Sequence, residues 1–452
     1  MQITDQLEMP ATNYTPPAYD GPSREEVAAL RDQYVHPSIF KIYKEPIMIV
    51  DGHMQWLFDE KGKRYLDMLA GIVTVSCGHC HPKIARKIQD QIGTLQHATT
   101  IYLHPGLALL SQKLASKMPD GLDVTYFVNT GSEANELAIN MARAYTGNTD
   151  VIALRNSYHG MSSTSAALTS HHTWKRDIPL GHRIHHAMNP DPYRSPFSGS
   201  PEEIASQSAN EISELIKFST PGAVAAFIAE PIQGVGGVTT GARNYLGEAY
   251  EIIREHGGLC IADEVQTGFG RTGENYWGFE NSGVKPDMVV LAKGIGNGVP
   301  MAAVTTTRAI AEAHTSKLHF NTYGGNPVSM AAGMAVLEVI EEEGLQENSR
   351  VVGGRLKEGM ERLKSRHDIV GDVRGMGLML GMEIVTDQAS KEPNAAATGV
   401  ILEELRERGV LVGKGGLYGN VLRIKPPMCV TKEDADYTVW ALDEALAAAS
   451  AN

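Results

Sequence analysis

One stretch of the chain reads Pro286-Asp-Met-Val-Val-Leu-Ala-Lys293 and continues as Gly294-Ile-Gly-Asn-Gly298, so a lysine stands between an apolar run and a glycine-rich loop. Earlier in the chain, the apolar run Leu259–Ala262 ends in Asp263-Glu264. A lysine that closes a buried strand is badly placed for a surface charge and well placed for covalent chemistry. If the two runs form neighbouring strands, Lys293 and Asp263 reach the same edge of one sheet.

Short apolar runs recur between about residues 71 and 330, and amphipathic helical stretches separate them. The runs are Val124–Val128, Val151–Leu154, Ala225–Ala229, Leu259–Ala262 and Met288–Ala292. This rhythm predicts an α/β fold with a mostly parallel sheet. We expect residues 182–222, which are polar and rich in proline, to form surface structure near the site.

An acid and an amine at one sheet edge are what enzymes that use pyridoxal phosphate (PLP) need, because the lysine forms a Schiff base with the aldehyde and the acid keeps the ring nitrogen protonated. An acid about 4 Å from that nitrogen contributes roughly 4 kcal/mol at an effective dielectric near 20. This corresponds to about three pKa units. The alternative for Asp263 is an acid that caps the next helix.

Two further segments follow predicted strands. Asn129-Thr-Gly-Ser-Glu-Ala-Asn135 opens a helix that runs to about Tyr145, and Gly131 and Ser132 at its start offer free N–H groups to a phosphate. Tyr158-His159-Gly160 follows Val151–Leu154, where an aromatic ring can stack on a flat cofactor. Each signal is weak alone, since many helices start this way and a loop tyrosine often packs on its neighbours. We expect the pair His171-His172 to be solvated.

The rest of the chain predicts a second, smaller domain. Ser23-Arg-Glu-Glu26 is a capping box that opens a helix to about Val35, after an extended arm over the first twenty residues. Residues 47–70 alternate apolar and polar and predict an antiparallel sheet. We therefore divide the chain into an arm and small-domain segment (1–70), a large PLP-binding α/β domain (71–335) and a C-terminal small α+β domain (336–452).

Length and charge narrow the class of protein. The 452 residues carry a net charge of −13, which argues against a general nucleic-acid partner. We find no apolar run long enough to span a membrane. Residues 1–8 lack the pattern of a secretion signal or a transit peptide, which favours the cytoplasm.

The segment Cys77-Gly-His-Cys80-His81 matches the pattern for c-type haem attachment and could also be half of a zinc site. Haem attachment usually requires export, and no second Cys/His pair has zinc spacing. We therefore favour a simple turn at Gly78 and Pro82 and predict no metal. The four cysteines are too few and too scattered for a disulfide framework.

With these pieces in place, the chain from about residue 40 to its end resembles the class III (ω-type) aminotransferases, PLP enzymes of fold type I. The segment Ile261–Gly273 followed by Lys293–Gly298 is highly specific to that class. The closest likeness is to type-2 alanine–glyoxylate aminotransferases. It rests on Asn156–Gly160, Met188–Tyr193, Gln233–Gly237, Phe320–Pro327 and Gly413–Asn420.

The resemblance implies a role for each site residue. Lys293 is the Schiff-base lysine and the proton shuttle, and Asp263 is the partner of the ring nitrogen. Around the cofactor, the resemblance implies that Gly131 and Ser132 bind the phosphate. Tyr158 and His159 cover one face of the ring, and Val265 covers the other. Gln266 contacts the ring hydroxyl, and Glu230 braces the Asp263 side of the ring. Thr322 reaches the phosphate in the neighbouring subunit of a homodimer, and whether dimers pair into tetramers is left open. Arg423 clamps the substrate carboxylate, and Ile72 and Tyr43 shape the pocket.

Two departures from related enzymes bear on the substrate. Ornithine and 4-aminobutyrate aminotransferases carry a glutamate that pairs with the clamp arginine, where this chain has Val235. Dialkylglycine decarboxylases carry a glutamine where this chain has Ile72. We therefore expect a ping-pong transaminase that moves an amino group from alanine or a short β-amino acid, such as 3-aminoisobutyrate, to glyoxylate or pyruvate.

Two rivals stay open at this point. A PLP lyase or phospholyase on the same scaffold would use the same lysine and the same ring, so the motifs barely separate it from a transaminase. A non-catalytic protein that kept the fold is the other, and the presence of Lys293, Asp263 and the phosphate turn speaks against it.

Overall fold

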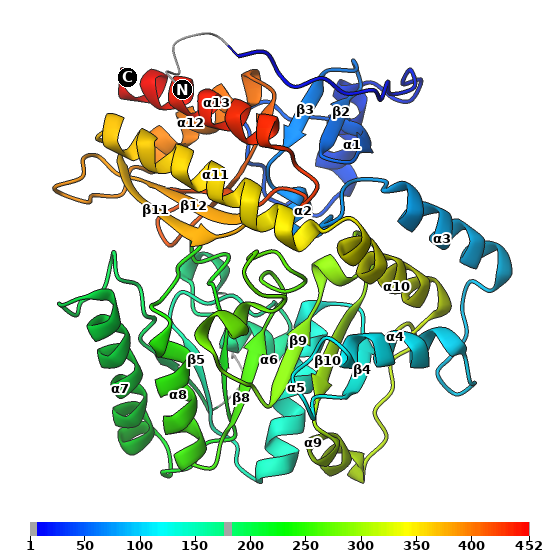
Figure 1. The fold of residues 1–452 in the computed structure, drawn as a ribbon, viewed down its shortest axis with the longest axis vertical. Coiled ribbons are helices and arrows are strands. Elements are labelled where there is room, and N and C mark those ends of the chain that lie inside the picture. Colours follow the sequence, from blue (N-terminus) through cyan, green and yellow to red (C-terminus); the bar gives the residue numbers. More distant parts are fainter. Residues whose placement is uncertain (1–6, 176–182, 452) are drawn as a thin grey trace.

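The computed structural model describes residues 7–175 and 183–451. Figure 1 shows a large α/β domain below a smaller domain, which confirms the predicted fold class. The expected extended arm is seen from residue 7 onward, and residues 1–6 lie outside the described part. No helix within the described ranges is long and apolar enough to cross a membrane.

The large domain is built on a seven-stranded sheet in the order β4-β10-β9-β8-β7-β5-β6. Its strands are β4 (Val124–Val128), β5 (Val151–Leu154), β6 (Ile184–Ala187), β7 (Ala226–Ala229), β8 (Leu259–Asp263), β9 (Met288–Leu291) and β10 (Ala302–Thr306). All neighbours from β9 to β6 pair in parallel, whereas β10 pairs antiparallel with both β4 and β9. The sheet is therefore mostly parallel with one reversed strand.

Helices cover both faces of this sheet, which explains why its strands are continuously apolar. In β5, Val151 and Ala153 pack in the core on the α5 (Gly131–Thr146) side, while Ile152 and Leu154 pack under α7 (Pro201–Ser219) and α8 (Asn244–Glu255). Figure 1 shows α7 and α8 in front of the sheet. The remaining helices of this domain are α3 (Pro82–Thr94), α4 (Pro105–Ala115), α6 (Ser163–Leu168), α9 (Arg308–Ala313) and α10 (Pro327–Glu342).

The smaller domain contains segments from both ends of the chain. One sheet, β1-β2-β3-β13, joins β1 (Ile49–His53), β2 (Trp56–Asp59) and β3 (Arg64–Asp67) to β13 (Val410–Leu411), and β13 pairs in parallel with β3. The second sheet, β11-β12-β15-β14, is antiparallel. Its strands are β11 (Val370–Met376), β12 (Met379–Ile384), β14 (Gly413–Gly415) and β15 (Val421–Ile424), and the domain's helices are α1 (Arg24–Tyr34), α2 (Ala70–Val73), α11 (Leu345–Arg366), α12 (Ala395–Glu407) and α13 (Lys432–Ser450).

Two sequence expectations need correction. The segment 182–222 is not merely surface structure, because it contributes the partly buried edge strand β6 and the long helix α7. The boundary placed at residue 335 falls inside α10, a continuous helix. We therefore propose that the large domain ends at Gly344, whose left-handed φ of 61° separates α10 from α11.

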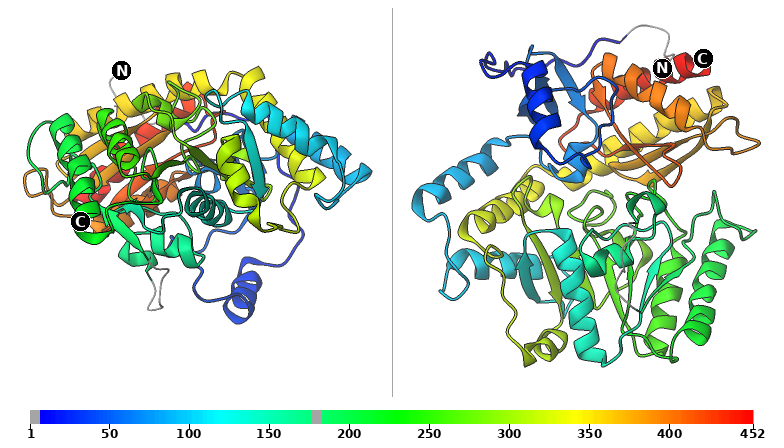
Figure 2. Two further views of the ribbon diagram at one scale, coloured as in Figure 1. Left: turned by 90° about the horizontal axis from the view of Figure 1, so that it is seen from below. Right: turned by 180° about the vertical axis from the view of Figure 1, so that it is seen from behind.

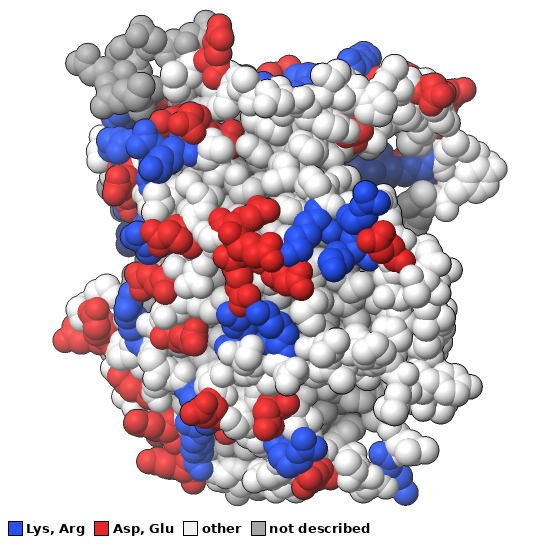
Figure 3. All heavy atoms as spheres, turned by 45° about the vertical axis from the view of Figure 1, so that its right-hand side comes forward, with Lys and Arg blue, Asp and Glu red and all other residues white. Residues whose placement is uncertain are grey.

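The surface carries charges of both signs. On the face drawn in Figure 3, acidic and basic side chains lie interspersed rather than in one broad patch of a single sign. On α10, Glu338, Glu341 and Glu342 pair with lysines of α3, α4 and the segment that follows α4: Lys83, Lys113 and Lys117. Such exposed pairs contribute little to stability individually, and they make the surface soluble.

Candidate functional site

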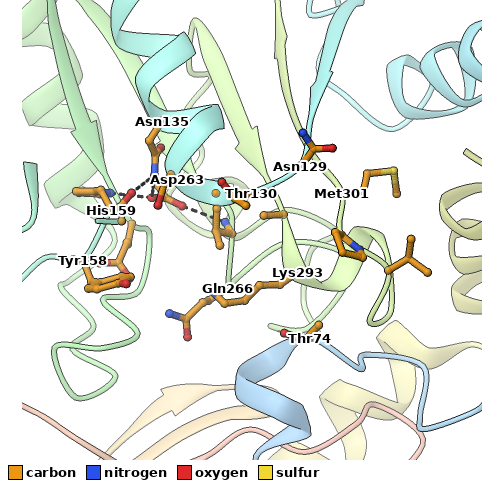
Figure 4. A pocket seen from close by; sticks show the side chains of 18 of the residues that line it. Thr74, Asn129, Thr130, Asn135, Tyr158, His159, Asp263, Gln266, Lys293 and Met301 are labelled. Atoms are coloured by element: carbon orange, nitrogen blue, oxygen red, sulfur yellow. Dashed lines mark hydrogen bonds and ion pairs between the residues drawn. The ribbon is translucent and has the colours of Figure 1, made fainter. Parts of the chain in front are cut away.

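The carboxyl ends of the parallel strands meet at one edge of the large sheet, and a pocket of about 300 Å³ lies there (Figure 4). Nine predicted residues line it: Gly131, Ser132, Tyr158, His159, Glu230, Asp263, Val265, Gln266 and Lys293. The pocket also contains Val299, Pro300 and Met301. These three precede β10, and they reach this edge because β10 runs opposite to its neighbours. The reversed strand thus presents its beginning to the pocket.

The start of α5 forms one wall of the pocket. Thr130 caps this helix: its hydroxyl accepts a hydrogen bond from the Glu133 N–H (3.2 Å), and the Glu133 carboxylate accepts one from the Thr130 N–H (3.2 Å). The first-turn N–H groups of Gly131 and Ser132 have no partner within the helix, as at every helix start. The Ser132 hydroxyl also accepts from the Met161 N–H (3.2 Å). This wall can therefore bind an anion.

Asp263 is the centre of a buried hydrogen-bonded group. Its Oδ2 accepts from the His159 Nδ1–H (2.7 Å) and from the Asn135 Nδ2–H (3.0 Å), and its Oδ1 accepts from the Val265 N–H (3.1 Å). The carboxylate is 3% exposed. Asp263 is therefore held in one orientation at the end of β8 and does not cap a following helix.

Glu230 joins two loops at the pocket. Its carboxylate accepts from the Tyr158 N–H (3.0 Å) and from the Gly234 N–H (2.7 Å). Burial raises the pKa of Glu230, and the nearby His159 opposes that effect. Glu230 contacts these two loops, so its bracing of the site acts through the segment that carries Tyr158 and His159.

Lys293 lies in the pocket with a backbone φ of 51°, in the left-handed region. This conformation costs a residue with a side chain roughly 1–3 kcal/mol, and such strain persists where the surroundings enforce it. Burial lowers the pKa of Lys293, while the charges of Asp263 and Glu230 oppose that effect. A lowered pKa leaves more of the amine neutral at a given pH, and the neutral amine is the form that acts as a nucleophile and as a base.

Arg423 is buried on β15, outside the pocket lining, and lies close against Gly415 at the end of β14. A Cβ added at Gly415 would lie 2.7 Å from Arg423 Cδ, so glycine makes room for this side chain. Burial lowers the pKa of Arg423 to about 10, and Glu230 opposes that effect. Its Nε has no hydrogen-bond partner among the described residues. A buried guanidinium with an unused donor can bind a carboxylate.

The other predicted residues lie outside the pocket lining. Thr322 is exposed on the loop that follows the 3-10 turn His314–Ser316. The Nδ2–H of the pocket residue Asn129 donates to Oδ1 of Asn321, the neighbour of Thr322 (3.4 Å). Ile72 is half-buried in α2, where the backbone of residues 70–73 is left-handed throughout, and Thr74 just beyond it does line the pocket. Tyr43 is half-buried against the core shared by the two domains.

Three residues at or near the site were not predicted to be functional from the sequence. Asn135 was not singled out, although a polar residue on the apolar face of the predicted helix was a signal. His171 is buried rather than solvated, because the loop that carries it packs beside Gly416 and Arg423, and burial lowers its pKa. Lys425 is fully buried two residues after Arg423, and this spacing places both side chains on one face of the extended chain.

The segment Cys77–His81 forms a turn before α3. Cys77 is buried, Cys80 is exposed, and His81 Nε2 lies 2.9 Å from Glu343 Oε1. Among residues 7–175 and 183–451, no group of three or more His, Cys, Asp or Glu side chains could hold a metal ion.

Comparison with known proteins points to one family. Residues 41–446 match the family described as aminotransferase class III. The chain is 51% identical over 438 residues to the Arabidopsis thaliana protein named alanine–glyoxylate aminotransferase 2 homolog 2, mitochondrial, covering 97% of this chain and 91% of that protein. It is 43% identical over 458 residues to human alanine–glyoxylate aminotransferase 2, mitochondrial, covering 97% and 89%.

Two solved structures have the same fold. An amine transaminase from an uncultivated Pseudomonas species, in its PLP-bound form, superposes with a TM-score of 0.86 at 32% identity, covering 92% of this chain and 98% of that one. A phospholyase from Arthrobacter in complex with phosphoethanolamine superposes with a TM-score of 0.87 at 34% identity, covering 93% and 99%.

The prediction of a cytoplasmic location is wrong on these comparisons, because both relatives are named as mitochondrial proteins. That prediction rests on the lack of a targeting pattern in residues 1–8, of which residues 1–6 lie outside the described part. The lack of a pattern in one short segment does not fix a compartment.

The pocket fits PLP on its own chemistry. It combines an anion-binding helix start, a buried carboxylate and a buried lysine around one cavity. A Cβ added at Gly160 would lie 2.2 Å from the Ser132 hydroxyl, so the wall beside the helix start tolerates only glycine there. His159 Nε2 is buried and has no partner among the described residues. With the family match, the chain therefore belongs to the class III aminotransferases, enzymes whose cofactor is pyridoxal phosphate.

Proposed function

We propose that this enzyme moves an amino group from alanine or a short β-amino acid, such as 3-aminoisobutyrate, to glyoxylate or pyruvate by a ping-pong mechanism. The observation that carries the proposal is the state of Arg423. The backbone oxygen of Val235 accepts from the Gly416 N–H (3.1 Å), so Val235 lies beside the loop that packs on Arg423. An acid at position 235 would stand next to the guanidinium, whereas valine leaves Arg423 free for a substrate carboxylate.

The side chains divide the work as follows. We assign phosphate binding to Gly131 and Ser132, the ring faces to Tyr158, His159 and Val265, and the ring hydroxyl to Gln266. PLP, when bound, supplies a ring that withdraws electrons from the substrate carbon. Asp263, which His159 and Asn135 hold in place, would face the ring nitrogen. Lys293 Nζ would bind the cofactor aldehyde and would carry the proton taken from the substrate carbon.

A ping-pong sequence follows from a single carboxylate clamp. Donor and acceptor both carry a carboxylate, and Arg423 can bind only one of them at a time. The first oxo acid must therefore leave before the second enters. Ile72 lies two residues before the pocket residue Thr74, and we propose that Ile72 and Tyr43 limit the size of the substrate side chain.

We expect alanine alone to change the visible absorption of the PLP-loaded enzyme and to release one equivalent of pyruvate per site. Glyoxylate should then restore the original spectrum, because the two half-reactions are separate. Donors whose reacting amine lies far from the carboxylate, ornithine and 4-aminobutyrate, should react at least about tenfold more slowly, since no acid at position 235 pairs with Arg423 when they bind. A spectrum that responds to 4-aminobutyrate and not to alanine would contradict the substrate assignment.

A PLP-dependent lyase is the second candidate, favoured by the likeness to a phospholyase solved with phosphoethanolamine. The same PLP-loaded sample distinguishes the two. Phosphoethanolamine should release neither phosphate nor ammonia at a rate comparable with transamination of alanine. Release of phosphate without an amine product would favour elimination.

We also propose that the enzyme is a homodimer with shared active sites. In Figure 2, α1 stands away from the body of the chain, and none of its residues is buried. The adjoining loops that carry His97 and Tyr323, whose rings lie 5.7 Å apart, also expose large apolar side chains. The exposed residues in these segments are Leu30, Tyr34, Phe40, Ile101, Tyr102, Leu103, Leu318, Phe320 and Tyr323. Exposed apolar side chains of this kind favour a protein partner, and we propose that the partner is a second copy of the chain.

The dimer predicts that Thr322 acts on the partner's cofactor. We expect Thr322→Val to weaken PLP binding about tenfold, the value of one hydrogen bond to a charged group, and Thr315→Val on the same surface to leave it unchanged. In a hybrid of wild type with a Lys293→Ala subunit, the remaining site should bind PLP normally. If the Lys293→Ala subunit also carries Thr322→Val, binding at the wild-type lysine should weaken. Normal binding in that hybrid would contradict the shared site.

A further inference from the structure

Gln266 occupies a tightly confined place in the pocket. It follows Val265 in the loop after β8, lines the cavity and is 6% exposed. Gly234 packs directly against it, since a Cβ added there would lie 2.4 Å from Gln266 Oε1 and 2.5 Å from Nε2. Glycine at position 234 therefore leaves room for the amide, and the orientation of the amide about the last side-chain bond depends on its hydrogen-bond partners.

Lys425 settles that orientation. Its Nζ donates to Gln266 Oε1 (3.0 Å) and to the Gly234 carbonyl oxygen (3.1 Å). The side chain is fully buried, and its backbone N–H is bound to the Met68 carbonyl oxygen (2.7 Å). The Gly234 carbonyl can only accept, and a lysine amine donates to both oxygens. Gln266 must therefore present its oxygen to Lys425 and its NH₂ group away from it.

The charges around Lys425 explain why an amine is tolerated here. Burial lowers its pKa well below the usual range, and the Arg423 cation adds to that effect while Glu230 opposes it. A buried lysine of this kind is costly to maintain, so its two hydrogen bonds need a purpose beyond packing.

We propose that Lys425 is a positioning residue that holds the Gln266 amide as a hydrogen-bond donor toward the cofactor. This rests on the proposed contact between Gln266 and the ring hydroxyl. Without Lys425 the amide can reverse, and its oxygen would then face the ring oxygen and repel it. Position 425 thus extends the role of β15, which already brings Arg423 to the site, from the substrate to the cofactor.

The test uses the pH midpoint of the visible absorption of the PLP-loaded enzyme, recorded without substrate. Gln266→Ala should shift this midpoint by about one pH unit, the effect of one hydrogen bond to a charged oxygen. Lys425→Met should shift it in the same direction, and Lys425→Met added to Gln266→Ala should cause no further shift. Lys425→Gln, which keeps an N–H donor, should return the midpoint toward that of the wild type.

Lys357→Met is the matched control, because Lys357 Nζ also donates to a carbonyl, that of Gly375 (2.9 Å), away from the pocket lining. It should leave the midpoint unchanged. Lys425→Leu is measured in parallel, with thermal unfolding, so that a folding defect in one variant does not decide the result. An unchanged midpoint in a folded Lys425→Met or Lys425→Leu enzyme, or a shift that adds to that of Gln266→Ala, overturns the proposal. An unchanged midpoint in Gln266→Ala instead overturns the assigned role of Gln266.

Discussion

Lys293→Ala is expected to lower the rate of alanine–glyoxylate transamination by at least about ten-thousandfold, because general acid–base transfer alone contributes up to that factor. The substitution removes both the covalent attachment of the cofactor and the amine that moves the proton. The phosphate wall at Gly131 and Ser132 is untouched, so PLP should still bind.

Steady-state assays of the coupled reaction measure the loss, and equilibrium dialysis measures the retained PLP. The matched control is Lys364→Ala on the surface of α11, where Nζ lies 3.8 Å from Asp372 Oδ1. That variant should keep wild-type activity. Wild-type turnover by Lys293→Ala would contradict the assignment of this pocket as the active site.

The second large effect is expected for Asp263→Asn. An interaction of about 4 kcal/mol with the ring nitrogen corresponds to a fall in rate on the order of a thousandfold. The amide has nearly the shape of the carboxylate and can still accept from His159 or Asn135, so the fold and PLP binding should be kept. The effect therefore isolates the charge from the shape.

Single-turnover kinetics with alanine measure this effect directly, since the first half-reaction contains the proton transfer. His159→Asn is the informative companion, because it removes the 2.7 Å contact to Asp263 Oδ2 without removing the charge. It should slow the same step by much less than Asp263→Asn does. An equal loss in both variants would mean that orientation, and not charge, is what Asp263 contributes.

The strand ends were accessible from sequence because each strand is apolar on both faces. The predicted bounds of β4 and β5 match the observed ones, and residues at or just beyond the ends of β7, β8 and β9 line the pocket. Ala302–Thr306 was missed because Ala-Ala-Val-Thr-Thr contrasts little with the loop before it. Helix α7 was missed although Ser200 and Glu203 form a capping box at its start.

Contacts that join distant segments could not be predicted from local pattern. Asn135 reaches Asp263 only because α5 packs across the ends of β4 and β8, and Lys425 reaches Gln266 only because the two domains close on each other. The reversal of β10, which brings Val299, Pro300 and Met301 to the pocket, is likewise a property of the assembled sheet. The family resemblance supplied Arg423 and Thr322, which no spacing in the chain would have identified.

The parallel pairing of β3 with β13 has a consequence for folding during translation. Leu66 and Asp67 of β3 are synthesised early, but they cannot pair until Val410 and Leu411 of β13 emerge close to the end of translation. The large sheet can form while synthesis continues, whereas the smaller domain must await nearly the whole polypeptide. Arg423 and Lys425 emerge later still. A nascent chain therefore contains Lys293 and the helix start at Gly131 and Ser132 before it contains the arginine that binds the substrate carboxylate.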